Sequence, residues 1–306
     1  MSDIKKVLTV KINYPEKINN STWFHPFYPN ETKNFKFEFV DTEADLVYNN
    51  IYNYTDTPVS AYDNDDAVLV PMPLYNREIN KKFNVISVPL VMQHENWNIT
   101  SDVGLLNELR NNIKKYDFIF VGDVNDWGIG IGDGRIVDGR VYSEFHDFYY
   151  NLDDYLEVNR EFLYKLKLDN FYLENVKNKI WDLSIEVRKN KVLEFVKKLS
   201  LSKFCFTPRG AGSSSYRLYE SLMVGTIPII TGMKDYPFSD IVDWDSFSFR
   251  TDSQKDIDEL VERAKSLTDN EYKVMRQNGI DFWEQYCRLD NLHDWVIESF
   301  LLNEYR

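Results

Sequence analysis

Residues 203–232 constrain the fold of this chain more than any other segment, because two short apolar strands there flank a turn and a helix. The segment reads KFCFTPRGAGSSSYRLYESLMVGTIPIITG. Its apolar runs, Phe204–Phe206 and Ile227–Ile230, are typical of buried strands. Between them we expect a helix from about Ser215 to Val224 that ends at Gly225. Strand, helix and strand in this order predict a parallel sheet covered by helices, the α/β class.

The turn between the first strand and the helix has the composition of an anion-binding site. Gly210 and Gly212 allow the backbone to approach a ligand closely. Three serines then offer N-cap oxygens, namely Ser213, Ser214 and Ser215. Free backbone N–H groups and the positive end of the helix dipole would face whatever lies above the sheet. We therefore expect a diphosphate to bind here.

Three charged residues near this turn fit the same ligand. Arg209 lies in the turn and Arg217 in the first helical turns, and a guanidinium can give a phosphate two hydrogen bonds. Glu220 follows Arg217 by three positions on the same helix face, where it could accept hydrogen bonds from ribose hydroxyls. The spacing alone equally allows an ordinary surface ion pair between Arg217 and Glu220.

The rest of the chain predicts two α/β domains. Apolar or alternating runs predict strands in the first half at residues 7–12, 35–40, 46–48, 67–70 and 85–92. Residues 102–115 have helical spacing, and Tyr116–Val121 is a clear strand before a glycine-rich loop. Residues 144–200 and 254–300 are expected to be helical. We place a first domain at residues 1–112 and a second at 113–284, with a helix of about residues 285–306 as a candidate to pack back on the first domain.

The net charge and the first residues of the chain limit which ligands and which cellular compartment are expected. The chain has 306 residues and a net charge of −13, so a nucleic-acid partner is not expected. The start of the chain contains only a short apolar strand, too short for a signal peptide or a membrane span. We therefore expect a cytoplasmic protein without a membrane span. The two cysteines, Cys205 and Cys287, need no disulfide in a chain of this size.

Several stretches together resemble the exostosin-like glycosyltransferases, glycosyltransferase family 47. They are SKFCFTPRG (202–210), SYRLYESLMVGTIPII (215–230), PFSDIVDWDSFSF (237–249) and FWEQY (282–286), with a weaker match in DTEADLVY (41–48). The resemblance covers about a quarter of the chain well and the first domain poorly. It implies a GT-B fold, in which two Rossmann-like domains face each other across a cleft. It also implies that the second domain holds the nucleotide-sugar donor.

The resemblance carries over to particular residues and to a reaction. The family's proline-arginine-glycine turn falls on Pro208, Arg209 and Gly210, and its arginine–acid helix falls on Arg217 and Glu220. It implies an inverting hexosyl- or pentosyltransferase that moves a sugar, expected to come from UDP-sugar, to a hydroxyl of a glycan acceptor. No metal or other cofactor is expected. The missing anchor of the family fits a bacterial or viral type.

The catalytic base is expected on a loop, because inverting transfer needs a carboxylate or imidazole to take the acceptor proton. His94 and Glu95 are the first choice, since the surrounding QHENWN is similar to a His-acidic-Trp element of some family members. Asp123 and Asp126, after the strand that opens the second domain, are the alternative. Arg135 and Arg140, which follow the glycine-rich loop, are further candidates for the diphosphate.

Other interpretations stay open. Asp243-Trp244-Asp245 has the pattern of a metal-binding DxD, but its place within an exostosin-like segment favours a turn. The main alternative function is a non-catalytic exostosin-like subunit that binds glycan or a partner enzyme. A third is a nucleotide-sugar epimerase of the same fold, which would interconvert sugars without an acceptor. The sequence does not indicate the oligomeric state.

Overall fold

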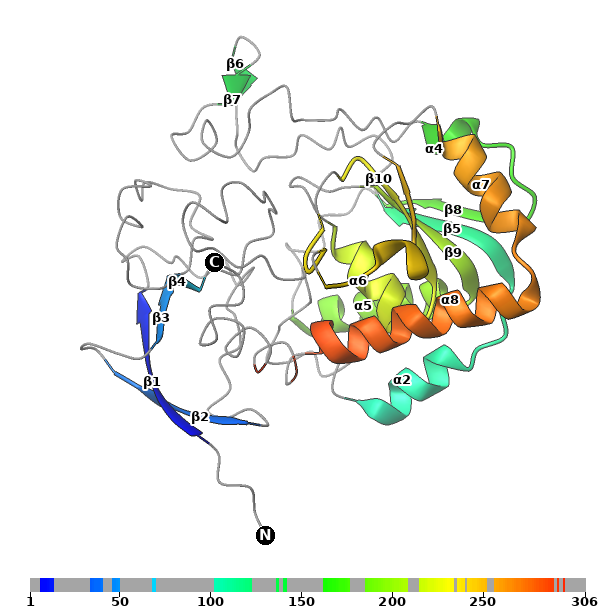
Figure 1. Ribbon diagram of the computed structural model, residues 1–306. Coiled ribbons are helices and arrows are strands. Elements are labelled where there is room, and N and C mark those ends of the chain that lie inside the picture. Colours follow the sequence, from blue (N-terminus) through cyan, green and yellow to red (C-terminus); the bar gives the residue numbers. More distant parts are fainter. Residues whose placement is uncertain are drawn as a thin grey trace.

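The computed structural model of the chain contains two parallel sheets (Figure 1). It describes residues 6–13, 34–40, 46–49, 68–69, 102–122, 136–137, 140–141, 162–176, 185–208, 215–233, 236–239, 241–251 and 256–288, together with residues 291 and 294. The α/β class with parallel sheets is confirmed, and the two sheets match the expectation of a GT-B protein.

The first sheet is built from residues of the first half of the chain. Its strands lie in the order β2-β1-β3-β4 and are β1 (Lys6–Asn13), β2 (Phe35–Phe39), β3 (Leu46–Asn49) and β4 (Val68–Leu69). The first three expected strands of this half are thereby confirmed, and two residues of the fourth are in a strand. The expected strand at residues 85–92 lies outside the described residues.

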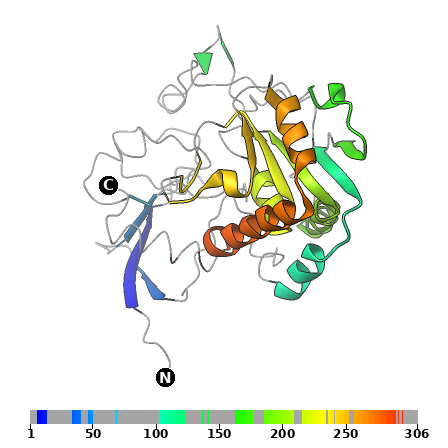
Figure 2. The ribbon, with the colours of Figure 1, turned by 45° about the vertical axis from the view of Figure 1, so that its right-hand side comes forward.

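The second sheet has five strands in the order β11-β10-β9-β5-β8, all parallel. They are β5 (Tyr116–Gly122), β8 (Phe171–Asn175), β9 (Ser202–Pro208), β10 (Ile227–Thr231) and β11 (Phe249–Thr251). A short antiparallel pair, β6 (Ile136–Val137) and β7 (Arg140–Val141), stands apart from both sheets in Figures 1 and 2.

Helices cover both faces of this second sheet. They are α2 (Val103–Arg110), α4 (Phe162–Lys165), α5 (Ile185–Ser200), α6 (Tyr216–Met223), α7 (Ile257–Ser266) and α8 (Asp269–Phe282), with the 3₁₀ turn η4 (Trp244–Ser246) and the π-helical turn η6 (Trp283–Cys287). On one face, α6 lies against α5, α8 and β10. On the other face, apolar residues of α4 and α7 pack with Phe118 and Phe120.

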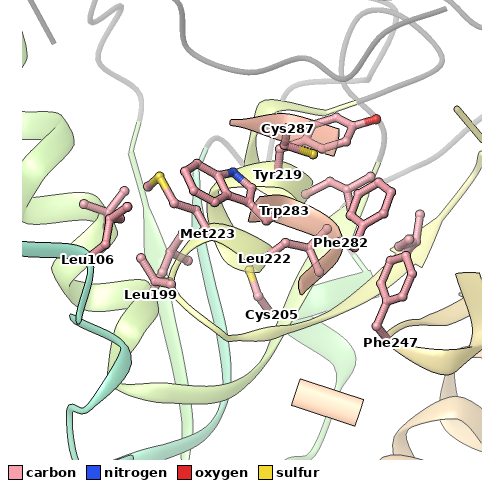
Figure 3. Packing of buried hydrophobic residues seen from close by; sticks show 14 of the residues in the cluster. Leu106, Leu199, Cys205, Tyr219, Leu222, Met223, Phe247, Phe282, Trp283 and Cys287 are labelled. Atoms are coloured by element: carbon pink, nitrogen blue, oxygen red, sulfur yellow. The ribbon is translucent and has the colours of Figure 1, made fainter. Parts of the chain in front are cut away.

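The larger apolar cluster lies on the α6 face. It joins residues of α2, α5, β9, α6, α8 and η6, among them Leu106, Leu199, Cys205, Leu222 and Trp283. Figure 3 shows these side chains gathered around α6. Leu8 of β1 and Phe35 of β2 belong to the same cluster, so the first sheet shares buried apolar contacts with the second. Both cysteines are buried and free, as expected for a chain of this size.

Two expectations for the elements are corrected. Residues 144–200 are not helical throughout, because Phe171–Asn175 forms the edge strand β8 beside β5. Four of its five residues are only half-buried, so it lacks the continuous apolar run of an inner strand. The helix expected at residues 102–115 ends at Arg110, and Ile113 is 86% exposed rather than packed.

Candidate active site

The strand order of the second sheet places a topological switch point between β5 and β9. Numbered by their sequence within the second sheet, the strands run 2-1-3-4-5, so the chain turns in opposite directions from β5 and from β9. In open α/β sheets, ligands bind outside the carboxyl ends of the strands at such a topological switch point. Ile119 lies opposite Cys205, and each strand ends three residues later, at Gly122 and Pro208. The switch point therefore lies between Gly122 and Pro208.

The turn expected to hold the diphosphate starts at this point. Pro208 ends β9, and α6 begins after the N-cap residue Ser215, whose backbone is extended. Within the described residues, the hydroxyl of Ser215 forms no capping hydrogen bond, so the expectation of a serine side-chain cap fails at this serine. Helix α6 ends at Met223 and is followed, as expected, by Gly225, where a φ of 68° suits glycine. Arg209, Gly210, Gly212, Ser213 and Ser214 lie outside the described residues.

Arg217 reaches from α6 to the end of β5. Its Nε donates a hydrogen bond to the carbonyl of Val121 at 3.0 Å. Its Cζ lies 4.4 Å from the centre of the Phe120 ring, a cation–π contact. Of the five N–H groups of a guanidinium, only the one on Nε has an acceptor among the described residues. The remaining four are therefore available to a ligand oxygen beside the switch point.

Glu220 is buried one helical turn further on. Its exposed fraction is 8%, and no hydrogen bond or ion pair to its carboxylate occurs among the described residues. Burial raises the pKa of Glu220 from 4.5 to about 7, and the positive charge of Arg217 opposes this rise. Arg217 and Glu220 thus do not form the surface ion pair that their spacing allows. A buried acid with a shifted pKa beside an arginine is typical of functional sites.

The other candidate residues are not brought to this point by the described structure. His94, Glu95, Asp123, Asp126 and Arg135 lie outside the described residues. Arg140 opens the short strand β7, which pairs with β6 and with neither large sheet. The roles expected for all six therefore stay predictions.

The surroundings of Arg217 were not predicted from the sequence. Neither Phe120 nor the Val121 carbonyl was expected at the site, although Gly122 directly follows the clearest strand of the chain. A glycine at the carboxyl end of a parallel strand was the available signal. Thr231 was also missed: it ends β10, it is 1% exposed, and its hydroxyl has no partner among the described residues.

The DxD-like stretch is a structural turn. Asp243 caps η4, and its carboxylate accepts a hydrogen bond from the backbone of Asp245 at 3.1 Å. Asp245 itself pairs with Arg250 at 2.8 Å. The expected turn is confirmed. Across the described part of the chain, no group of three or more His, Cys, Asp or Glu residues is arranged to hold a metal ion.

The comparison with protein families addresses this same sheet. Residues 154–267 match the model of the exostosin GT47 domain. This part of the chain is similar to the exostosin GT47 domain. The match runs from before α4 to the end of α7, so the exostosin-like domain includes Arg217 and Glu220, whereas β5 lies before it. The resemblance to exostosin-like glycosyltransferases drawn from the sequence is confirmed.

Two relatives extend the similarity. The chain is 25% identical over 234 residues to the exostosin-1 homolog of Caenorhabditis elegans, covering 74% of this chain and 55% of that protein. It is 29% identical over 107 residues to a probable glycosyltransferase of Arabidopsis thaliana, covering 35% of this chain and 22% of that protein. The chain thus spans about half of the length of the first relative and less of the second.

Among solved structures, the chain is similar to S. aureus TarM, crystallised as a mutant with fondaparinux, α-GlcNAc-glycerol and UDP. The TM-score is 0.41 at 13% identity, covering 90% of this chain and 51% of TarM. Among the helices that the structure describes, none combines the length and the apolar character needed to cross a membrane.

Proposed function

We propose that this chain is an inverting glycosyltransferase that moves a hexosyl or pentosyl group from a nucleotide-sugar, a UDP-sugar in the first instance, to a hydroxyl of a glycan acceptor. The observation that carries the proposal is that one helix, α6, holds both Arg217, which reaches the carboxyl end of β5, and the buried Glu220. Arg217 supplies N–H donors that have no acceptor among the described residues, and Glu220 supplies a buried carboxyl group. Both lie in the segment that matches the exostosin GT47 domain.

The charges suit the leaving group of the reaction. When the acceptor oxygen attacks the anomeric carbon, the bond to the diphosphate breaks and negative charge grows on the phosphate oxygens. A guanidinium and the N–H groups at the start of α6 stabilise that charge where it develops. Arg209 and the glycine turn of residues 210–214 are proposed to hold the same diphosphate, and Arg140 and Arg135 are secondary candidates.

Glu220 suits the ribose of the donor. Its carboxyl group can accept hydrogen bonds from paired hydroxyls, and a ligand that satisfies a buried carboxylate removes part of the cost of its burial. The proton of the acceptor hydroxyl needs a separate base. We propose His94 or Glu95 for this role, with Asp126 as the alternative, and a reaction that needs no bound metal.

The first experiment is calorimetric titration of the protein with UDP, GDP and CMP, with and without EDTA. We expect one nucleotide to bind, and EDTA to leave its dissociation constant unchanged. Arg217→Ala should raise that constant about tenfold or more, because charge-assisted hydrogen bonds to the diphosphate are lost. Circular dichroism and the melting temperature check that the variant remains folded.

Arg263→Ala is the matched control. Arg263 also lies over a phenylalanine, with its Cζ 5.5 Å from the ring centre of Phe249, but it belongs to α7 on the opposite face of the sheet. This variant should bind the nucleotide as the parent does. If no nucleotide binds, or if Arg217→Ala binds as tightly as the parent protein, the proposed donor site is wrong and a non-catalytic subunit becomes the better description.

A further inference from the structure

We infer that Gly122 is a positioning residue for Arg217: its missing side chain lets the guanidinium lie across the end of β5, with Phe120 beneath it. The inference rests on the proposed function, because it concerns how the donor site is built. It adds two residues outside the segment that matches the exostosin GT47 domain.

The path of the Arg217 side chain crosses from one face of the sheet to the other. Helix α6 lies on the face of the larger apolar cluster, which contains Leu218, Tyr219 and Val121. Phe120 belongs to the cluster of the opposite face. The guanidinium nevertheless lies over the Phe120 ring, with Cζ 4.4 Å from its centre. It reaches that ring only by passing around the carboxyl end of β5.

Gly122 is the residue that leaves this path open. A Cβ placed on Gly122 would overlap Nη2 of Arg217 and lie 3.3 Å from its Cζ and from Cζ of Phe120. The guanidinium occupies the space that any other residue would fill. An alanine there must displace a group that is held from below by the aromatic ring and from the side by the Val121 carbonyl.

These contacts hold the guanidinium in place while most of its N–H groups keep no acceptor among the described residues. The single bond from Nε to Val121 orients the plane of the group, and the two Nη atoms keep their N–H groups without an acceptor among the described residues. Because the group is held before a ligand arrives, less side-chain entropy is lost when a diphosphate binds. Gly122 and Phe120 thereby act on the ligand through Arg217 and need no contact with it.

The experiment is a double-variant cycle on nucleotide binding with Gly122→Ala, Arg217→Ala and the combined variant, titrated with UDP. We expect Gly122→Ala to raise the dissociation constant about tenfold, close to the effect of Arg217→Ala. The combined variant should bind no more weakly than Arg217→Ala alone, because the glycine acts only through the arginine. Effects that multiply in the combined variant would overturn the inference.

Gly279→Ala is the matched control for the cost of adding a methyl group. A Cβ on Gly279 would lie 2.9 Å from Cδ2 of Leu222, in the packing between α8 and α6 and away from β5. It should lower the melting temperature and leave UDP binding unchanged. A loss of UDP binding in Gly279→Ala equal to that in Gly122→Ala would show that general loosening, not positioning, weakens the site, and would overturn the inference.

A second variant keeps the test decisive if Gly122→Ala does not fold. Phe120→Leu removes the aromatic face under the guanidinium and keeps an apolar side chain, and it enters the same cycle with the same expected result. Wild-type affinity in both Gly122→Ala and Phe120→Leu, beside weakened binding in Arg217→Ala, would overturn only the positioning inference. Unchanged binding in Arg217→Ala would instead overturn the proposed function.

Discussion

At the scale of single residues, Arg217 and Glu220 lie three positions apart on α6 in different surroundings, since Arg217 contacts the Phe120 ring and Glu220 is buried. The three-residue spacing of Arg217 and Glu220 follows from helical geometry, and the shared helix was correctly expected. The contact of Arg217 with Phe120 depends on how α6 lies against β5, which no local pattern encodes. For the same reason, burial of Glu220 at 8% exposure is a property of the folded chain alone.

Glu220 should make stability depend on pH in the acidic range. Its pKa is about 7 when folded and 4.5 otherwise, so the folded chain holds a proton that the unfolded chain releases between these values. Its contribution is fully present below pH 4.5 and is lost as the pH rises through 7. Relative to Glu220→Gln, the unfolding free energy of the parent should fall by at most about 3 kcal/mol over this range.

Denaturant titrations of both proteins at pH 5, 6 and 7 measure this difference. Glu262→Gln serves as the control, because Glu262 is exposed and pairs with Lys265 on the surface of α7. Parallel pH profiles for the parent and Glu220→Gln would show that the buried carboxyl group does not titrate as described.

At the scale of elements, the strands with continuous apolar runs were predictable and the marginal ones were not. β5, β9 and β10 are inner strands whose central residues are buried, so each contains a continuous apolar run. β8 lies at the edge and is half-buried, and its sequence FYLEN is short and carries a charge. The helical assignment of residues 144–200 was wrong there because charged residues with occasional apolar ones also describe an amphipathic helix.

The start of α8 offers a direct test of local stabilisation. The Thr268 hydroxyl accepts a hydrogen bond from the backbone of Glu271, whose carboxylate accepts one from the backbone of Thr268 at 2.8 Å. Thr268→Ala should lower the unfolding free energy by about 1 kcal/mol, the usual cost of losing an N-cap. Urea unfolding measures it, and Lys273→Ala at an exposed position of the same helix should change little. An unchanged midpoint in Thr268→Ala would contradict the capping role.

At the scale of the whole molecule, the sequence predicts parallel sheets but not the order of the strands within them. Alternating strands and helices predict parallel α/β layers, and both sheets are parallel as expected. The position of the switch point follows from the pairing of β5 with both β8 and β9. These two pairings join residues more than 50 positions apart, as Phe118 with Phe171 and Tyr116 with Ser202 illustrate, and no periodicity in the sequence reveals them.

Cations hold several elements together where α6 ends. Lys114 donates hydrogen bonds to the carbonyls of Ser200, at 2.8 Å, and Gly225, at 3.3 Å. Arg276 of α8 donates to the same Gly225 carbonyl at 3.0 Å and to the carbonyl of Arg110. Burial, and next the charge of Arg276, lower the pKa of Lys114 from 10.5 to about 7. A titratable group therefore lies among α2, α5, α6 and α8.

Because of Lys114, the free energy of unfolding should increase as the pH rises above 7. Between pH 7 and 10.5 the unfolded chain keeps a proton on this amine that the folded chain has lost, so the group favours folding more as the pH rises. Relative to Lys114→Met, the parent should gain up to roughly 1 kcal/mol per pH unit from pH 7 to 9. Chemical denaturation at each pH measures this, and Lys115→Met, at the exposed neighbouring position, should follow the parent. Equal pH slopes for the parent and Lys114→Met would contradict the prediction.

The contact between the two ends of the described chain has a consequence for synthesis on the ribosome. The backbone N–H of Asn34 donates to Asp294 at 3.2 Å across 260 positions, and Leu8 and Phe35 share a buried cluster with Phe282 and Trp283. The strands of the first sheet therefore find part of their packing among residues that are translated about 260 positions later. Until those residues emerge from the ribosome, the nascent first sheet carries apolar side chains without their final partners, so its packing is completed late.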